Sequence, residues 1–110
     1  MNVTFTARHF RPHEDVKQHA LREVKKLGKF YDGIVTANII LSFERATNSL
    51  KSAEINLHVY GTVLSAGEKS DDFVKSIDKT VEKLYLQLTK YKARLRSKDK
   101  TTVRKIHDKV

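Results

Sequence analysis

The chain has 110 residues, enough for one domain with a modest core, because a domain of this size buries roughly 60–70% of the surface that its unfolded chain exposes. It contains no cysteine, which excludes disulfides and cysteine-based zinc or redox sites, and no run of about 18 consecutive apolar residues, which excludes a membrane-spanning helix. Lys and Arg number 22 against 13 Asp and Glu, a net charge of +9 that favours polyanionic partners such as RNA, DNA or an anionic membrane surface.

The positive charge is concentrated in the second part of the chain. Residues 1–68 carry nine basic and seven acidic side chains, a net charge of +2. Residues 69–110 carry thirteen basic and six acidic side chains, a net charge of +7. A concentrated positive field of this kind points to a binding surface in the second part of the chain.

The N-terminal residues, MNVTFTARHFRP, lack the basic stretch and apolar run of a signal peptide, so we expect a cytoplasmic protein. Residues 2–8 alternate between apolar and polar side chains, which predicts a short strand with one buried face. Pro12 is well placed to open a helix, which we expect over residues 13–29. Its apolar side chains recur at three- and four-residue steps, at Val16, Ala20, Val24 and Leu27. Its other side carries Arg22, Lys25, Lys26 and Lys29.

Three strands with short connections are expected next. Residues 34–45 alternate, and the side chains expected to face the core are Val35, Ala37, Ile39, Leu41 and Phe43. Residues 51–60 alternate again, with Ala53, Ile55, Leu57 and Val59 expected inside. Turns are expected at residues 46–49 and at Gly61-Thr62, and a last short strand covers residues 63–68. Consecutive strands with short connections predict an antiparallel meander.

A second, longer helix is expected after Ser70, which is a good N-cap and is followed by Asp71 and Asp72. Its apolar residues step by three or four positions, at Phe73, Ile77, Val81, Leu84, Leu88, Tyr91 and Leu95. The periodicity is lost beyond about Arg96. We therefore expect one domain over residues 1–96 and a flexible basic tail over residues 97–110.

The order of these elements, β-α-β-β-β-α, predicts an α+β fold. The economical packing is a four-stranded sheet with both helices on its apolar face, as in double-stranded-RNA-binding domains.

The outer face of the second helix carries a row of cations. At 100° per residue, measured from Leu84, the apolar stripe spans about −20° to 60° and the cations lie at about 180° to 280°. They form a ridge roughly 25–30 Å long, with Glu82 as the acidic residue at its edge. The ridge consists of Lys75, Lys79, Lys83, Lys90 and Arg94. Most charge runs are merely solvated helix faces, but such faces normally mix signs at four-residue spacing, so this pattern favours binding of a polyanion.

The sequence shows no pattern typical of an enzyme or of a metal site. It contains no GxSxG, P-loop, GxGxxG or HExxH motif. Asp78 and Glu82 lie one helical turn apart, like a catalytic carboxylate pair, but each has a lysine beside it, which favours surface ion pairs. His58 and Tyr60 would project from the polar sheet face, yet the strands lack the aromatic pattern of RNA-recognition sheets. We therefore expect no catalysis, metal, cofactor or small-molecule substrate.

Three segments resemble the ribosome hibernation factor family, which includes the hibernation promoting factor and the ribosome-associated inhibitor. They are NVTFTARHF, LREVKKLGKFYDGI and IDKTVEKLYLQLTKYK, and the resemblance covers residues 2 to about 96. The most specific pattern is that of the last segment, with Asp72, Ile77-Asp78, Lys83-Leu84, Gln87-Leu88, Lys90 and Lys92. Long members of the family carry a further C-terminal domain, so this chain resembles the short type.

The resemblance implies the β-α-β-β-β-α fold and a function. Members lie in the channel of the small ribosomal subunit that holds messenger RNA and the A- and P-site transfer RNAs, and they inhibit translation during stress or stationary phase. It implies a monomer that binds small-subunit rRNA, and the intact ribosome, through phosphates, with no role for DNA or a membrane. The expected rRNA contacts are Arg8, Arg22, Lys25, Lys26, Lys29, Lys75, Lys79, Lys83, Lys90, Lys92, Arg94 and Arg96.

Two positions depart from the family pattern. Val74 stands where an aromatic residue is usual, and Leu86 stands where an arginine is usual. Leu86 falls at about 200° on the helix, inside the basic ridge. The lack of a cation there weakens the expectation of an rRNA contact at this position. Lys75 and Lys79, where relatives often have small or apolar residues, can compensate.

Two other functions remain open. One is a general double-stranded-RNA-binding or RNA-chaperone module acting off the ribosome, which would not depend on intact small subunits. The other is an interaction protein that uses the polar sheet face, whose binding would persist at high salt.

Overall fold

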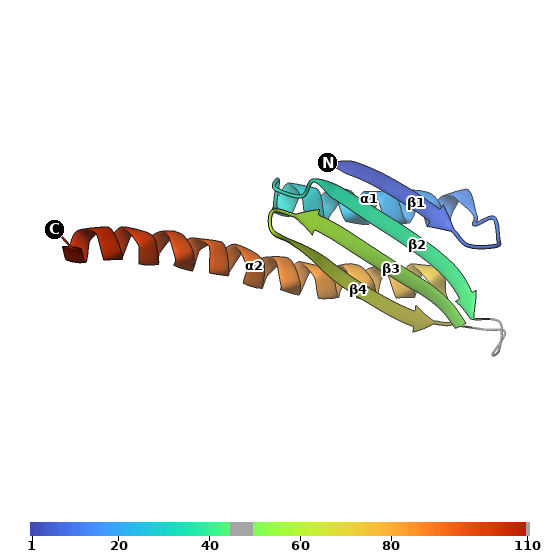
Figure 1. Cartoon of the computed structure of the whole chain (residues 1–110). Coiled ribbons are helices and arrows are strands. Elements are labelled where there is room, and N and C mark those ends of the chain that lie inside the picture. Colours follow the sequence, from blue (N-terminus) through green and yellow to red (C-terminus); the bar gives the residue numbers. More distant parts are fainter. Residues whose placement is uncertain (45–49, 110) are drawn as a thin grey trace.

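The computed structural model describes residues 1–44 and 50–109, without the side chains of residue 44 and of residues 97–109. Its elements are β1 (Asn2–Ala7), α1 (Glu14–Phe30), β2 (Thr36–Glu44), β3 (Leu50–Val59), β4 (Thr62–Ser70) and α2 (Phe73–Lys109). Figure 1 shows their arrangement. The predicted α+β order is confirmed, while the turn expected at residues 46–49 lies outside the described residues.

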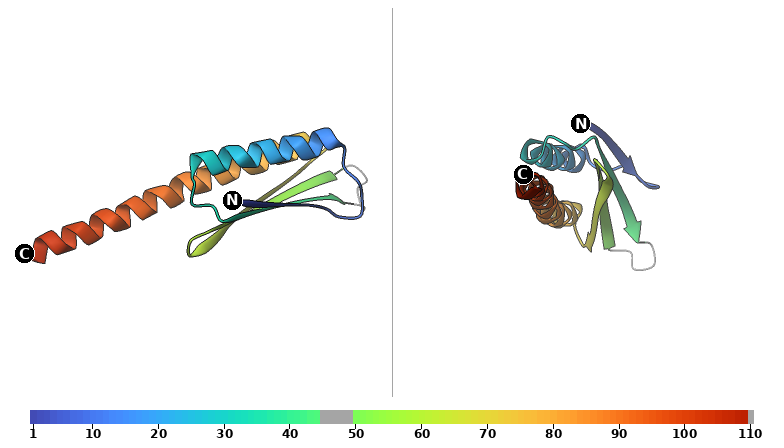
Figure 2. Two further views of the ribbon diagram at one scale, coloured as in Figure 1. Left: turned by 90° about the horizontal axis from the view of Figure 1, so that it is seen from above. Right: turned by 60° about the vertical axis from the view of Figure 1, so that its left-hand side comes forward.

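The four strands form one mixed sheet in the order β1-β2-β3-β4. Strands β2, β3 and β4 pair antiparallel, which confirms the predicted meander. Strand β1 pairs parallel to β2, and a parallel pair needs a crossover connection, which α1 provides. Both helices lie on one face of the sheet, as predicted, and the other face is uncovered (Figure 2).

The core lies between the sheet and the two helices. Side chains of β2 and β3 fill its centre in the predicted phase, with Ala37, Ile39, Leu41, Ala53, Ile55, Leu57 and Val59 buried. The predicted burial of Val35 and Phe43 is wrong, because both are exposed. Val35 precedes β2, and its neighbour Ile34 fills the core there instead. Phe43 lies at the far end of β2, where Phe10 and Phe73 cover it only in part.

Helix α2 packs on β3 and β4 through its apolar stripe and two small polar residues. The predicted residues Phe73, Ile77, Leu84, Leu88 and Tyr91 are buried. Ser76 and Thr80 are also buried, which their hydroxyl groups did not suggest. The Ser76 hydroxyl donates to the Lys51 carbonyl of β3 at 2.7 Å, and the Thr80 hydroxyl donates to the Ser76 carbonyl at 2.7 Å. Hydrogen-bonded hydroxyls of this kind are tolerated in a core, and their small side chains let the helix lie close to β3.

Both ends of α2 differ from the prediction. The N-cap is Asp72, whose carboxylate accepts a hydrogen bond from the Lys75 N–H at 3.3 Å, so the predicted cap at Ser70 is wrong. Ser70 instead accepts from the Asp72 N–H at 3.2 Å, just before the helix. The helix continues to Lys109, past its expected end, because no Gly or Pro follows Gly67 to stop it. A flexible tail over residues 97–110 stays a prediction.

Candidate nucleic-acid interface

The expected cations lie mainly on α1 and α2, the two helices that cover one face of the sheet. The helices run next to each other (Figure 2), and His19 of α1 contacts Asp78 of α2 at 2.6 Å. All the expected cations of α1 are exposed, and so are all but one of those of α2. We call them together the basic helical surface: Arg22, Lys25, Lys26, Lys29, Lys75, Lys79, Lys83, Lys90, Arg94 and Arg96.

Most of these cations are not neutralised by neighbouring carboxylates. Lys26 pairs with Glu23 at 2.7 Å, and Lys75 pairs with Asp71 at 3.6 Å. Lys83 is also paired, with a residue of the sheet. Within the described part of the chain, no ion pair involves Arg22, Lys25, Lys29, Lys79, Lys90, Arg94 or Arg96. Exposed cations without such partners are available to the phosphates of a nucleic acid, which they bind with release of counterions.

Lys83 is held by the edge strand β4. Its Nζ pairs with the Glu68 carboxylate and donates to the Gly67 carbonyl at 3.4 Å. The hydrogen bond and the charge of Lys83 hold the pKa of Glu68 below its ordinary value, and the charge of Lys79 adds to the effect. This pair joins α2 to β4 and takes one positive charge from the basic helical surface.

Two of the expected rRNA contacts, Lys92 and Arg8, lie outside the basic helical surface. Lys92 is half-buried beside α1, where its Nζ donates to the Phe30 carbonyl at 3.1 Å and lies 4.3 Å from the centre of the Phe30 ring. Because Phe30 is the last residue of α1, Lys92 supplies a favourable cation at that helix C-terminus. Arg8 is exposed after the end of β1, outside both helices.

One cluster between the helices has the residue types of a metal site. The ligand atoms of His19, Glu23 and Asp78 lie within 4.8 Å of one another. His19 Nε2 and Asp78 Oδ1 lie 2.6 Å apart and join the two helices, whereas Glu23 Oε2 pairs with Lys26 at 2.7 Å but is a buried oxygen that accepts no hydrogen bond. Asp78 pairs with His19 and not with the adjacent Lys79, contrary to the sequence-based interpretation.

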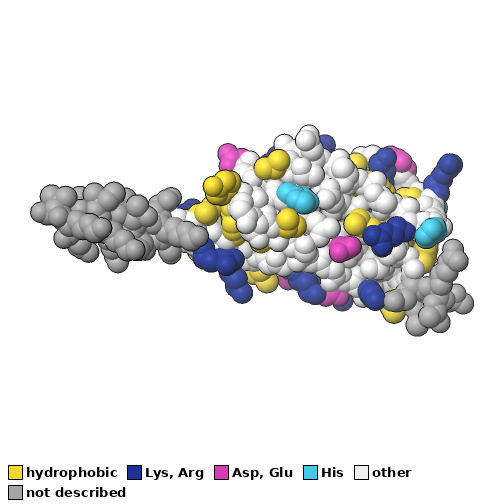
Figure 3. Space-filling model, in the orientation of Figure 1, with side chains coloured by type: hydrophobic (Ala, Val, Ile, Leu, Met, Phe, Trp, Pro, Cys, Tyr) yellow, Lys and Arg dark blue, Asp and Glu magenta, His cyan; other side chains and the backbone are white. Residues whose placement is uncertain are grey.

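The uncovered face of the sheet differs from the helical side. In Figure 3 its centre is occupied mainly by uncharged side chains. Polar groups on neighbouring strands hydrogen-bond one another, Thr4 to Asn38 at 2.7 Å and Asn38 to His58 at 3.1 Å. Tyr60 is 86% exposed, whereas His58 is half-buried.

The described helices include none long and apolar enough to cross a bilayer.

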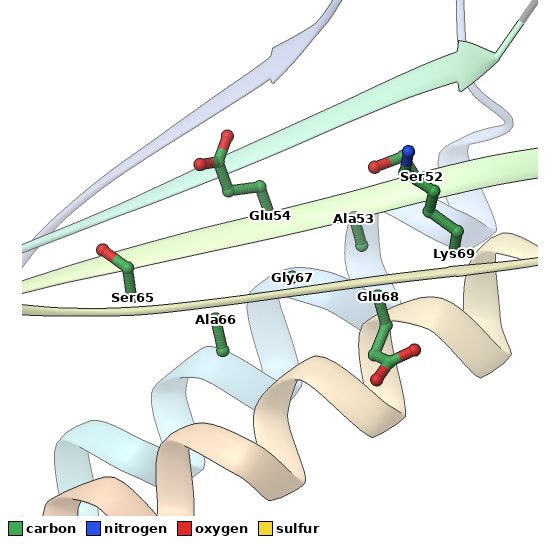
Figure 4. Close-up of a pocket in the computed structure, with 8 residues that line it drawn as sticks. All are labelled: Ser52, Ala53, Glu54, Ser65, Ala66, Gly67, Glu68 and Lys69. Carbon is green, nitrogen blue, oxygen red and sulfur yellow. The ribbon is translucent and has the colours of Figure 1, made fainter.

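A shallow hollow also opens on this face, over Gly67 of β4. Gly67 lies directly opposite Glu54 of β3, and its missing side chain leaves the gap. Figure 4 shows that Ser52, Glu54 and Lys69 point to the same side, whereas Ala53, Ala66 and Glu68 point toward the helices. The hollow is thus a gap in the outward side-chain layer of the sheet.

Comparison with known proteins identifies a family. The model of the family described as sigma 54 modulation protein / S30EA ribosomal protein matches residues 3–96. The ribosome hibernation promoting factor of Klebsiella oxytoca is 38% identical over 71 residues, which cover 64% of this chain and 72% of that protein. The factor of the same name from Escherichia coli (strain K12) is 27% identical over 96 residues, which cover 87% of this chain and 98% of that protein.

Solved structures show the same fold. A ribosomal subunit interface protein from Coxiella burnetii matches with a TM-score of 0.76 and 25% identity, over 84% of this chain and 99% of its own. The N-terminal domain of Thermus thermophilus Protein Y matches with a TM-score of 0.71 and 22% identity, over 83% and 99%. The latter supports the fold alone.

Proposed function

The chain belongs to the sigma 54 modulation protein / S30EA ribosomal protein family, and we propose from this premise that its basic helical surface binds small-subunit rRNA during ribosome hibernation. Relatives carry the names ribosome hibernation promoting factor and ribosomal subunit interface protein. The protein acts as a monomer in the cytoplasm, with the small subunit or the intact ribosome as its partner.

The observation that carries the proposal is the set of unpaired, exposed cations on two adjacent helices. Phosphate contacts position a protein on RNA without reading its sequence, which suits a body that must fit a groove walled by rRNA. In the channel that holds messenger RNA and the A- and P-site transfer RNAs, such a body inhibits translation by occupying space. This mechanism requires shape and charge, and no bond is made or broken.

A general double-stranded-RNA-binding module is the second candidate. Helices on one face of an antiparallel sheet also serve domains that bind RNA duplexes by shape, and the basic helical surface suits that use as well. The two functions differ in their dependence on the ribosome. A duplex-binding module would bind any long RNA duplex about as well as the small subunit.

The test removes the charge of α2. Changing Lys79, Lys83, Lys90 and Arg94 together to Gln should abolish co-sedimentation with small subunits and with whole ribosomes. The matched control replaces the three lysines by Arg and Arg94 by Lys, which keeps every charge. All four side chains are exposed, so circular dichroism should show both variants folded. Undiminished co-sedimentation of the folded Gln variant would refute the proposal.

A further inference from the structure

An aromatic pair joins α1 and α2 beside the basic helical surface. Tyr85 of α2 packs against Phe30 of α1, with ring centres 4.5 Å apart and planes inclined by 38°. The Tyr85 side chain is still 46% exposed, and that of the next residue, Leu86, is 57% exposed. Within the described part of the chain, no hydrogen bond fixes the Tyr85 hydroxyl. One side of the ring is thus supported by Phe30 while much of the ring remains open.

Tyr85 lies between cations of the two helices. Lys29 precedes Phe30 in α1, and Lys92 lies over the Phe30 ring at 4.3 Å. On α2, Lys79 and Lys90 lie about 120–140° around the helix from Tyr85, beyond Leu86, and the acidic residues Asp78 and Glu82 lie about two turns and one turn before Tyr85. Isolated exposed apolar residues are common and need no explanation. Here, however, the ring is braced by the Phe30 ring and lies between Lys29 of α1 and the outward cations of α2.

We propose that Tyr85 is a stacking platform for an unpaired base of the RNA whose phosphates the surrounding lysines bind. The inference rests on the proposed function and adds a contact that is not electrostatic. Every nucleobase has a flat π-face, and proteins that bind single-stranded RNA combine cations along the backbone with aromatic rings under the bases. The Phe30 ring keeps Tyr85 in place, so little conformational freedom is lost on binding.

A protein partner fits this patch less well. Protein–protein interfaces are depleted of Lys at their centre, and two apolar side chains offer only a small apolar area. The lysines around Tyr85 would have to be desolvated against a protein, whereas phosphates would neutralise them. Charge complementarity therefore favours RNA as the occupant.

The test compares three substitutions at Tyr85 in binding to small subunits over a series of salt concentrations. Tyr85→Ala should weaken binding by roughly 5- to 150-fold, the range found for the loss of one stacked base. The slope of affinity against salt should not change, because no phosphate contact is lost. Tyr85→Phe should bind like the wild type. Tyr85→Leu keeps apolar packing against Phe30 but removes the ring, so it should bind like Tyr85→Ala.

Tyr60→Ala is the matched control, because Tyr60 is more exposed but lies outside the two helices. Its binding should equal that of the wild type. Tyr85→Ala binding within twofold of the wild type would overturn the inference. So would a loss seen with intact subunits but not with protein-free rRNA, because Tyr85 would then contact a ribosomal protein.

A single-stranded RNA that carries the fluorescent base 2-aminopurine separates this inference from the proposed function. The wild-type protein should quench the fluorescence of the stacked base, and the Ala and Leu variants should not. Quenching by the wild type without binding to small subunits would refute only the ribosomal function. Equal quenching by all variants would refute only the stacking role.

Discussion

Glu68 limits the charge that helix α2 can offer to a partner. Its carboxylate holds Lys83, whose charge would otherwise join the unpaired cations of the basic helical surface. A phosphate must displace this carboxylate before it can bind Lys83.

Replacing Glu68 by Gln should therefore tighten binding to small subunits and make its salt dependence steeper by about one phosphate contact. Glu54→Gln makes the same change of charge on the opposite face of the sheet and is the control. Equal effects of the two substitutions, measured by salt titration, would mean that binding depends only on the net charge of the protein.

The pH dependence of folding tests the same pair. The pKa of Glu68 is lowered in the folded protein, so the pair's contribution to stability is present above the ordinary carboxylate pKa. It is lost as the pH falls through the lowered value. Chemical denaturation should show wild type more stable than Glu68→Gln at neutral pH, with the difference vanishing in acid. A difference that stays constant from neutral to acidic pH would contradict this assignment.

Leu86 is an exposed apolar residue among the cations on the outward face of α2. Leu86→Arg should strengthen binding to small subunits, because it adds a cation to this row, and should change the free energy of unfolding by less than about 0.5 kcal/mol. Thermal unfolding and co-sedimentation measure the two effects. A stable variant with unchanged affinity would show that this part of α2 does not face RNA.

At the scale of the element, one side of α2 packs in the core and stabilises the fold, and the other side is exposed for binding. Leu84 is 0% exposed and Leu86 is 57% exposed, although they are two residues apart. Leu84→Ala should lower the free energy of unfolding by about 2–5 kcal/mol, because it leaves a cavity in the core. Leu86→Ala is the matched control and should change it by less than about 0.5 kcal/mol in urea denaturation. Similar losses for both would mean that Leu86 is part of the core.

Periodicity predicted most of the elements correctly. The two-residue period of β2 and β3 and the mixed three- and four-residue period of α2 identified the buried side chains, because burial on one face is what creates such periods. The periods gave no correct prediction of burial at positions where local geometry determines it. Val35 and Phe43 lie at strand ends, and Ser76 and Thr80 are buried through hydrogen bonds that a polar residue type does not reveal.

At the scale of the whole molecule, the sequence indicated the cations of the surface but not their partners. Contacts such as His19–Asp78 and Lys92–Phe30 join residues 59 and 62 positions apart, and no local pattern reports them. The same holds for the parallel pairing of β1 with β2, which is formed across the whole of α1. The ring contact between Phe30 and Tyr85 also depends on the packing of one helix against the other.

The salt dependence of binding to isolated small subunits tests the central claim most directly. If the basic helical surface neutralises about six phosphates, the logarithm of the affinity should fall with the logarithm of the salt concentration at a slope near −5. An RNA duplex of random sequence should bind much more weakly than the small subunit at every salt concentration. A slope near zero, or equal affinity for the duplex, would contradict the assignment of this surface to the rRNA of the small subunit.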